Sequence, residues 1–309
     1  MAGVVLLVLL AFATGLIALV VLLVMTLRSG RPEANPPAVA RAARRHEALM
    51  SLGAALASLA AVIGIVLLPD IVWTSEFQPL PVAPGVLQYT CPFVGAVVFC
   101  LARAVGEQWW PRPSGTVRTA VLARRSVTEL GGWRLAALAA TTSLGLLAVV
   151  GYGVTAAPGG RTVAHVPTYD ADGTVIGTGE AGPYPGWPFG IPIAAGLVLA
   201  FGAALLALWV VTRRPALALV PREHDDAVRR TSAARVLAGS QAWVGGAMAL
   251  MMLVAAVPLN GAGHTGGALA SLVAGVVVGA GSLVVAVSAI PGLRAREAAG
   301  RKAAEPVSA

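Results

Sequence analysis

The chain has 309 residues, of which 57% are hydrophobic and only 12% are charged, and its mean hydropathy is +0.79. A soluble domain carries about 25% charged residues, so this composition excludes an ordinary water-soluble globule and favours a lipid bilayer as the solvent. The formal net charge of +8 admits either nucleic acid or a membrane surface as a partner, and the distribution of the charge along the chain decides between them.

Apolar runs long enough to cross a membrane recur along the whole chain. Each has about 20 residues or more, which as a helix covers roughly 30 Å of hydrocarbon. The runs are continuous rather than alternating, which indicates helices and not barrel strands. We therefore predict an all-α polytopic membrane bundle of seven helices in a single domain, residues 1–292, followed by a disordered cytoplasmic tail, 293–309. The predicted helices cover residues 3–27, 47–69, 85–106, 134–156, 188–212, 238–258 and 266–290.

The basic residues predict the orientation of these helices. The first run has no basic segment before it and is longer than the apolar core of a signal peptide, so we expect it to be a retained helix. With the N-terminus outside, every Lys and Arg except Arg161 falls in four inner segments, 28–46, 103–134, 213–237 and 291–309. This bias predicts an N-terminus outside and a C-terminus inside. The preference for arginine, alanine and glycine suggests a high-GC bacterium and hence its plasma membrane.

The same distribution accounts for the net charge. The basic residues are divided among short segments held against a membrane, and no zinc-finger, helix-turn-helix or RNA-binding motif is present, so we expect no nucleic acid partner. We expect anionic lipids on the inner face instead. The candidate lipid contacts are Arg112, Arg118, Arg124, Arg125, Arg229 and Arg230.

Residues 106–126, GEQWWPRPSGTVRTAVLARRS, lie where the third helix leaves the bilayer. Trp109 and Trp110 are placed at headgroup level, where tryptophan is enriched, and Pro111 ends the helix. Residues 116–125 then fit a short amphipathic helix on the membrane surface. The stretch is either an interfacial loop or a specific site for an anionic lipid or a protein partner.

This stretch also carries a resemblance. Gly106-Glu107, Trp110-Pro111-Arg112-Pro113, Gly115 and Arg118 are similar to a segment of uncharacterised polytopic membrane proteins of high-GC bacteria. The similarity covers a small part of the chain. It implies a multi-pass membrane protein, and because that family has no known activity it implies no mechanism.

Three arginine pairs precede outward-going helices: Arg44-Arg45, Arg124-Arg125 and Arg229-Arg230. They indicate either three related helical hairpins, as in many transporters, or only the orientation rule. Before the sixth helix, acid-before-base pairs at i, i+4, Asp225 with Arg229 and Asp226 with Arg230, predict an exposed helical extension that starts near residue 222.

The outer loop, residues 157–187, predicts a small β-hairpin outside the membrane. Two β-branched stretches flank an Asp-Gly turn, DADG at 170–173. Asp170, Asp172 and Glu180 do not follow the spacing of an EF-hand loop, because Gly179 occupies the step that needs a glutamate. We expect a turn here and no metal site.

Catalytic and cofactor signals are missing from the sequence. No charged residue lies near the middle of a predicted helix, and Arg103 and Glu107, at the inner edge of the third, are expected to reach the headgroups. The seventh helix contains no lysine for retinal, and no histidine pair is placed to bind haem. Protease and nucleotide-binding motifs are also absent. We expect no catalytic residue and no cofactor.

Two sets of residues remain as candidates for a site or for helix packing. The polar set either lines a pocket or forms hydrogen bonds between helices; its members are Gln88, Tyr89, Thr90, Thr141 and Gln241. The glycine set lets helices approach closely, either within one chain or in a homo-oligomer; its members are Gly245, Gly246, Gly275 and Gly279.

These observations favour a non-enzymatic membrane component: a scaffold, an assembly factor or an accessory subunit with a membrane protein partner. The alternative is a permease or carrier for a neutral or apolar solute or a lipid, suggested by the polar set and the hairpin pattern. A third hypothesis is an interfacial enzyme that uses Asp70, Glu76 or Asp170.

Overall fold

The computed structural model describes residues 38–72, 86–109, 126–215 and 222–289. This part of the chain is mostly helical, and six of its helices are long and apolar enough to cross a membrane, which is the pattern of a multi-pass membrane protein. The helices are α2 (Ala38–Val72), α3 (Val86–Gln108), α4 (Val127–Thr155), α5 (Trp187–Arg213), α6 (Arg222–Gly261) and α7 (Thr265–Ser288). They coincide with six of the predicted helices, while the predicted helix at 3–27 and the tail at 293–309 lie outside the described residues.

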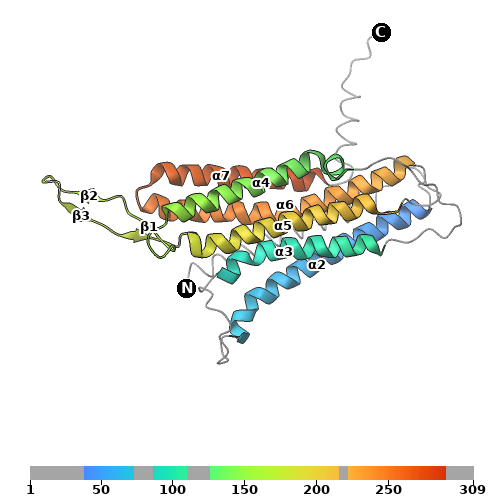
Figure 1. Cartoon of the computed structure of the whole chain (residues 1–309), viewed down its shortest axis with the longest axis horizontal. Coiled ribbons are helices and arrows are strands. Elements are labelled where there is room, and N and C mark those ends of the chain that lie inside the picture. Colours follow the sequence, from blue (N-terminus) through green and yellow to red (C-terminus); the bar gives the residue numbers. More distant parts are fainter. Residues whose placement is uncertain (1–37, 73–85, 110–125, 216–221, 290–309) are drawn as a thin grey trace, which may run out of the picture.

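The six helices run alternately up and down and form an elongated bundle (Figure 1). The starts of α2, α4 and α6 and the ends of α3, α5 and α7 lie together at one end, which we call the arginine end. The opposite end, where the strands project, is the strand end. Helix α6 touches all the other helices, α7 packs mainly on α6, and α2 packs mainly on α3 and diverges from the bundle toward its far end.

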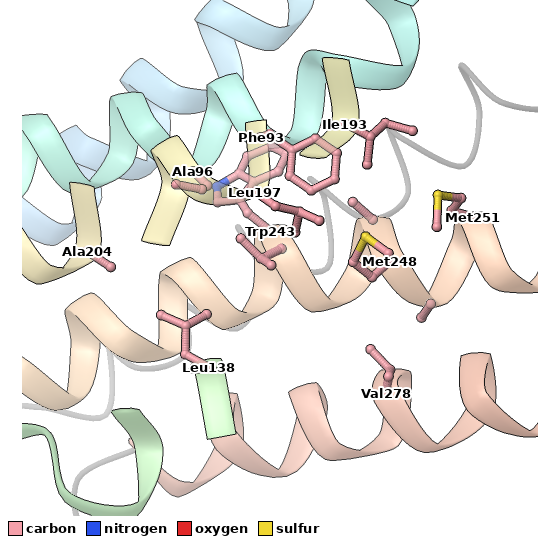
Figure 2. Packing of buried hydrophobic residues seen from close by; sticks show 14 of the residues in the cluster. Phe93, Ala96, Leu138, Ile193, Leu197, Ala204, Trp243, Met248, Met251 and Val278 are labelled. Atoms are coloured by element: carbon pink, nitrogen blue, oxygen red, sulfur yellow. The ribbon is translucent and has the colours of Figure 1, made fainter. Parts of the chain in front are cut away.

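Side chains from α3, α4, α5 and α7 pack together with those of α6 in the core (Figure 2). Trp243 of α6 is 2% exposed and lies beside α3, where Gly95 leaves room for it: a Cβ atom at Gly95 would stand 2.9 Å from Val62 Cγ2 and 3.2 Å from the indole. Gly196 of α5 admits Phe93 of α3 in the same way, at 2.8 Å. Lipid tails are as apolar as these side chains, so close contact rather than hydrophobic burial holds such helices together.

Helix α4 begins with a short segment set at an angle to the rest. Ser126 caps it by accepting a hydrogen bond from the Glu129 amide at 3.1 Å. Gly132 then takes φ 51° and ψ −142°, a conformation that a residue with a side chain rarely adopts. The long straight part follows, which agrees with the predicted start at residue 134. Arg134 donates to the Ser288 carbonyl at 2.8 Å and so ties this bend to the end of α7.

Two short antiparallel strand pairs occupy the connection between α4 and α5. Strand β1 (Val163–Ala164) pairs with β4 (Glu180–Ala181), and β2 (Thr168–Tyr169) pairs with β3 (Val175–Gly177). The β1–β4 pair is held on the bundle, because His264 Nε2 bonds the Ala164 carbonyl at 2.8 Å. The β2–β3 pair projects away from the helices (Figure 1).

The turn between β2 and β3 is built around Asp170. One of its carboxylate oxygens accepts from the amides of Asp172, at 3.0 Å, and Thr174, at 2.8 Å. Gly173 follows with φ 78°. This is an Asx-type turn, in which the aspartate holds its own backbone, and it lies at the Asp-Gly step where the sequence predicts a turn.

Candidate functional site: a buried charge network at the arginine end

Charged side chains from four elements converge inside the arginine end. Each is at most 5% exposed, although six of the seven lie within candidate membrane spans. We call this set the buried charge network; its members are Glu47 of α2, Arg103 and Glu107 of α3, Arg214 directly after α5, and Asp225, Arg229 and Arg235 of α6.

Glu47 connects the first described helix to the rest of the bundle. One of its oxygens accepts from Arg103 Nη2 at 3.0 Å, and the other forms an ion pair with Arg235. Ser51, one turn further along α2, accepts from Arg103 Nη1 at 3.1 Å. His46 also bonds the Gly106 carbonyl of α3 at 3.1 Å. The start of α2 is thus bound to both α3 and α6.

Glu107 forms the second node, which joins α3, α5 and α6. Its Oε1 accepts from Ser232 Oγ at 2.5 Å and from Arg103 Nη2 at 3.3 Å, and its Oε2 accepts from Arg214 Nη1 at 3.0 Å. Burial lowers the pKa of the Arg214 guanidinium, the Glu107 and Asp225 carboxylates oppose that shift, and neighbouring Arg229 adds to it. The carboxylates therefore offset the cost of holding Arg214 charged inside the bundle.

Arg229 and Asp225 form the third node, at the end of α5. Arg229 Nε donates to Asp225 Oδ2 at 2.9 Å, and its two other nitrogens donate to the carbonyls of Val211, at 2.9 Å, and Arg214, at 2.7 Å. The last carbonyls of a helix have no partners within the helix and carry partial negative charge. The guanidinium of Arg229 satisfies them from α6.

Two sequence expectations are corrected here. Arg229, predicted to contact anionic lipids, is 1% exposed and is bonded within the protein. Arg103 and Glu107, which were expected to extend outward to the headgroups, instead point into the bundle and are bonded there. A buried ion loses several kcal/mol of hydration, and only several close partners offset that cost. The i, i+4 spacing of Arg103 and Glu107 was the feature of the sequence from which their ion pair could have been predicted.

The predicted pair Asp225–Arg229 is present, although it is buried rather than solvated. Arg230, the next residue and another predicted lipid contact, is exposed. The extension of α6 to Arg222 is confirmed. One turn of this helix therefore presents one arginine to the protein interior and the other to its surroundings.

A second, uncharged cluster joins α4, α6 and α7 deeper in the bundle. Gln241 Nε2 donates to Thr141 Oγ1 at 2.8 Å and to Ser282 Oγ at 3.0 Å. Gly245 makes this contact possible, because a Cβ atom there would collide with Ser282 Oγ. The Gln241 Oε1 and Thr142 Oγ1 atoms are buried and have no hydrogen-bond partner among the described residues.

The predicted polar set is therefore divided between two places in the bundle. Thr141 and Gln241 meet in the cluster above, whereas Gln88, Tyr89 and Thr90 lie in the first turns of α3, toward the strand end. Tyr89 packs on Phe189 of α5 there, with ring centroids 4.8 Å apart.

The predicted glycine set lies on α6 and α7. Gly275 faces Ala249 and Leu253 of α6, since a Cβ atom at Gly275 would stand 3.0 Å from the Ala249 carbonyl oxygen, and Gly279 also faces Ala249. Gly245 faces α7, and Gly246 is half-buried. The contacts of Gly245, Gly275 and Gly279 all lie between α6 and α7 of one chain.

Several candidate residues fall outside this description of the bundle. Those beyond the described residues are Arg112, Arg118, Arg124, Arg125 and Glu76, together with the amphipathic segment at 116–125. Asp70 lies near the end of α2.

In the buried charge network, the carboxylates and the guanidiniums neutralise one another. Over the described ranges, no group of three or more His, Cys, Asp or Glu side chains is placed to hold a metal ion. Cys91 and Cys100 are both buried, and Cys100 Sγ lies 3.0 Å from Ser240 Oγ. What the network does is join α2, α3, the end of α5 and α6 by directional bonds inside a membrane bundle.

Comparison with known proteins identifies no relative whose function could inform that of this chain. No protein-family model matches the chain, and neither the curated proteins nor the solved structures contain a significant match.

Proposed function

We propose that the protein crosses the plasma membrane of a bacterium seven times, with its N-terminus outside and its C-terminus inside. The arginine end is then cytoplasmic, and the strands project from the outer face as a small hairpin. Among the described arginines only Arg161 lies at the strand end, which supports this orientation.

We infer that it works as a non-enzymatic structural component, an accessory or assembly subunit of a membrane complex. One observation carries this inference: the charged groups in the described interior pair with one another, and most of these pairs join different helices. Intramembrane charges that serve transport usually face a water-filled cavity or a substrate. Here Glu47 and Glu107 each hold two arginines and connect neighbouring helices.

A carrier for a small neutral solute is the second candidate. It is favoured by the Gln241 Oε1 and Thr142 Oγ1 atoms, two buried acceptors without a hydrogen-bond partner in the described structure. A buried acceptor without a partner costs about 1–3 kcal/mol, and a bound hydroxyl or amide group would supply the missing donor.

Mass spectrometry of the protein extracted together with its native lipids, without detergent, separates these candidates. A protein partner at fixed stoichiometry, retained by a Gln241→Leu variant, is expected for a structural component. A single small molecule bound without any protein partner, and lost in Gln241→Leu, would replace this function with the carrier. Thr212→Val near the end of α5 is the matched control, because its hydroxyl bonds its own helix at Trp209.

A further inference from the structure

Adjacent arginines at the arginine end face in opposite directions. Arg214 and Arg229 are buried in the charge network, whereas their neighbours Arg213 and Arg230 are exposed. Successive helical residues differ by about 100° around the axis, so one member of each pair turns inward and the other outward. Arg45 is exposed in the same way, two residues before buried Glu47.

The exposed arginines carry charge that the described carboxylates do not neutralise. In the described ranges no carboxylate forms an ion pair with Arg45, Arg213 or Arg230. They belong to the starts of α2 and α6 and the end of α5, which the buried network binds together. We call these three residues the arginine rim. The network beneath them holds their backbones in place.

Tryptophans mark the level of the headgroups at this end. Trp109 at the end of α3, Trp133 near the start of α4 and Trp209 near the end of α5 are 73%, 46% and 43% exposed. Such aromatic side chains concentrate at the membrane–water boundary. The guanidinium of Arg213 lies 4.3 Å from the centroid of the Trp209 ring, so the exposed arginine is held against an exposed aromatic face.

We propose that the arginine rim binds acidic phospholipids, with the Trp209–Arg213 pair holding the phosphodiester of one headgroup. A guanidinium presents a planar fork of donors that matches two phosphate oxygens. The Trp209 ring provides an apolar face for the first part of the acyl chains. Arg45 and Arg230 add positive charge around the same end, so a lipid with net negative charge is favoured over a zwitterionic one.

The test uses the full chain in nanodiscs made from equal parts of phosphatidylglycerol and phosphatidylcholine. Native mass spectrometry then gives the ratio of the two lipids that stay bound as the disc is removed. We expect phosphatidylglycerol to be enriched on the wild-type protein and the enrichment to fall about fivefold in Arg213→Gln, since an arginine near an anionic surface contributes about 1 kcal/mol. Trp209→Leu keeps the charge and is expected to lose part of the enrichment.

Arg161→Gln is the matched control, because it removes one exposed arginine at the strand end, and it is expected to leave the ratio unchanged. Arg213→Gln and Arg161→Gln both replace exposed side chains and should leave the thermal unfolding midpoint unchanged. A loss of bound lipid in Arg213→Gln would then not be caused by unfolding. The proposal is overturned if Arg213→Gln binds the two lipids as the wild type does, or if Arg161→Gln reduces the ratio equally. It is also overturned if an acidic protein, rather than lipid, stays bound through Arg213.

Discussion

Glu107→Gln is the sharpest perturbation of the charge network. The substitution keeps the volume of the side chain and one acceptor oxygen, and it removes the negative charge between Arg103 and Arg214. Both guanidiniums remain buried, with side chains 0% exposed. Removing one partner from a buried ion pair costs about 3–5 kcal/mol. Because the amide oxygen still accepts one bond, we expect the lower value, about 3 kcal/mol, which changes the unfolding equilibrium by roughly 100-fold or more.

The free energy of unfolding can be measured by steric trapping in bicelles or by titration with a denaturing detergent. A double-mutant cycle with Arg214→Gln isolates the pair: the double variant should be more stable than the sum of the single losses predicts, with a coupling of about 1–3 kcal/mol. Glu129→Gln, an exposed glutamate in the first turn of α4, is the control and should change stability by less than about 0.5 kcal/mol. A Glu107→Gln protein as stable as the wild type, or a coupling of zero, would refute the reasoning.

Three further outcomes follow from the interior of the bundle. Gln241→Leu removes two hydrogen bonds between helices, each worth roughly 0.6 kcal/mol. It also removes a buried acceptor without a described partner, so the unfolding free energy should fall by less than about 1 kcal/mol. A much larger loss in a denaturant titration would contradict this balance. Gly245→Ala should destabilise by about 1–3 kcal/mol through overpacking, whereas Gly281→Ala, with no atom within 4 Å of the new Cβ, should be tolerated; equal effects would contradict the close α6–α7 contact. Cys91 and Cys100 are both buried, so a maleimide should label neither until the protein is unfolded, and rapid labelling of the folded protein would contradict their burial.

The local sequence pattern predicted the helices well, because the formation of a membrane-spanning helix depends on the hydropathy of that segment alone. The run at 188–212 became Trp187–Arg213, and the run at 266–290 became Thr265–Ser288. The bend of α4 at Gly132 was not predicted, since a glycine is also tolerated in a straight helix. The pairing of Gln241 with Thr141 joins residues 100 positions apart in the chain, and no periodicity within one helix carries that information.

In the charge network, some features are specified by the sequence of single segments and others only by the packing of the helices. The gathering of the arginines at one end of the helices follows from the amino-acid sequence, because apolar length and the placement of basic residues are properties of individual segments. The divergence of Arg229 and Arg230 also follows from it, because a helix turns about 100° per residue. Which of the two faces inward depends on how the helices pack. A buried guanidinium is stable only beside a carboxylate such as Glu107 or Asp225, and the position of that carboxylate relative to the other helices exists only in the folded bundle.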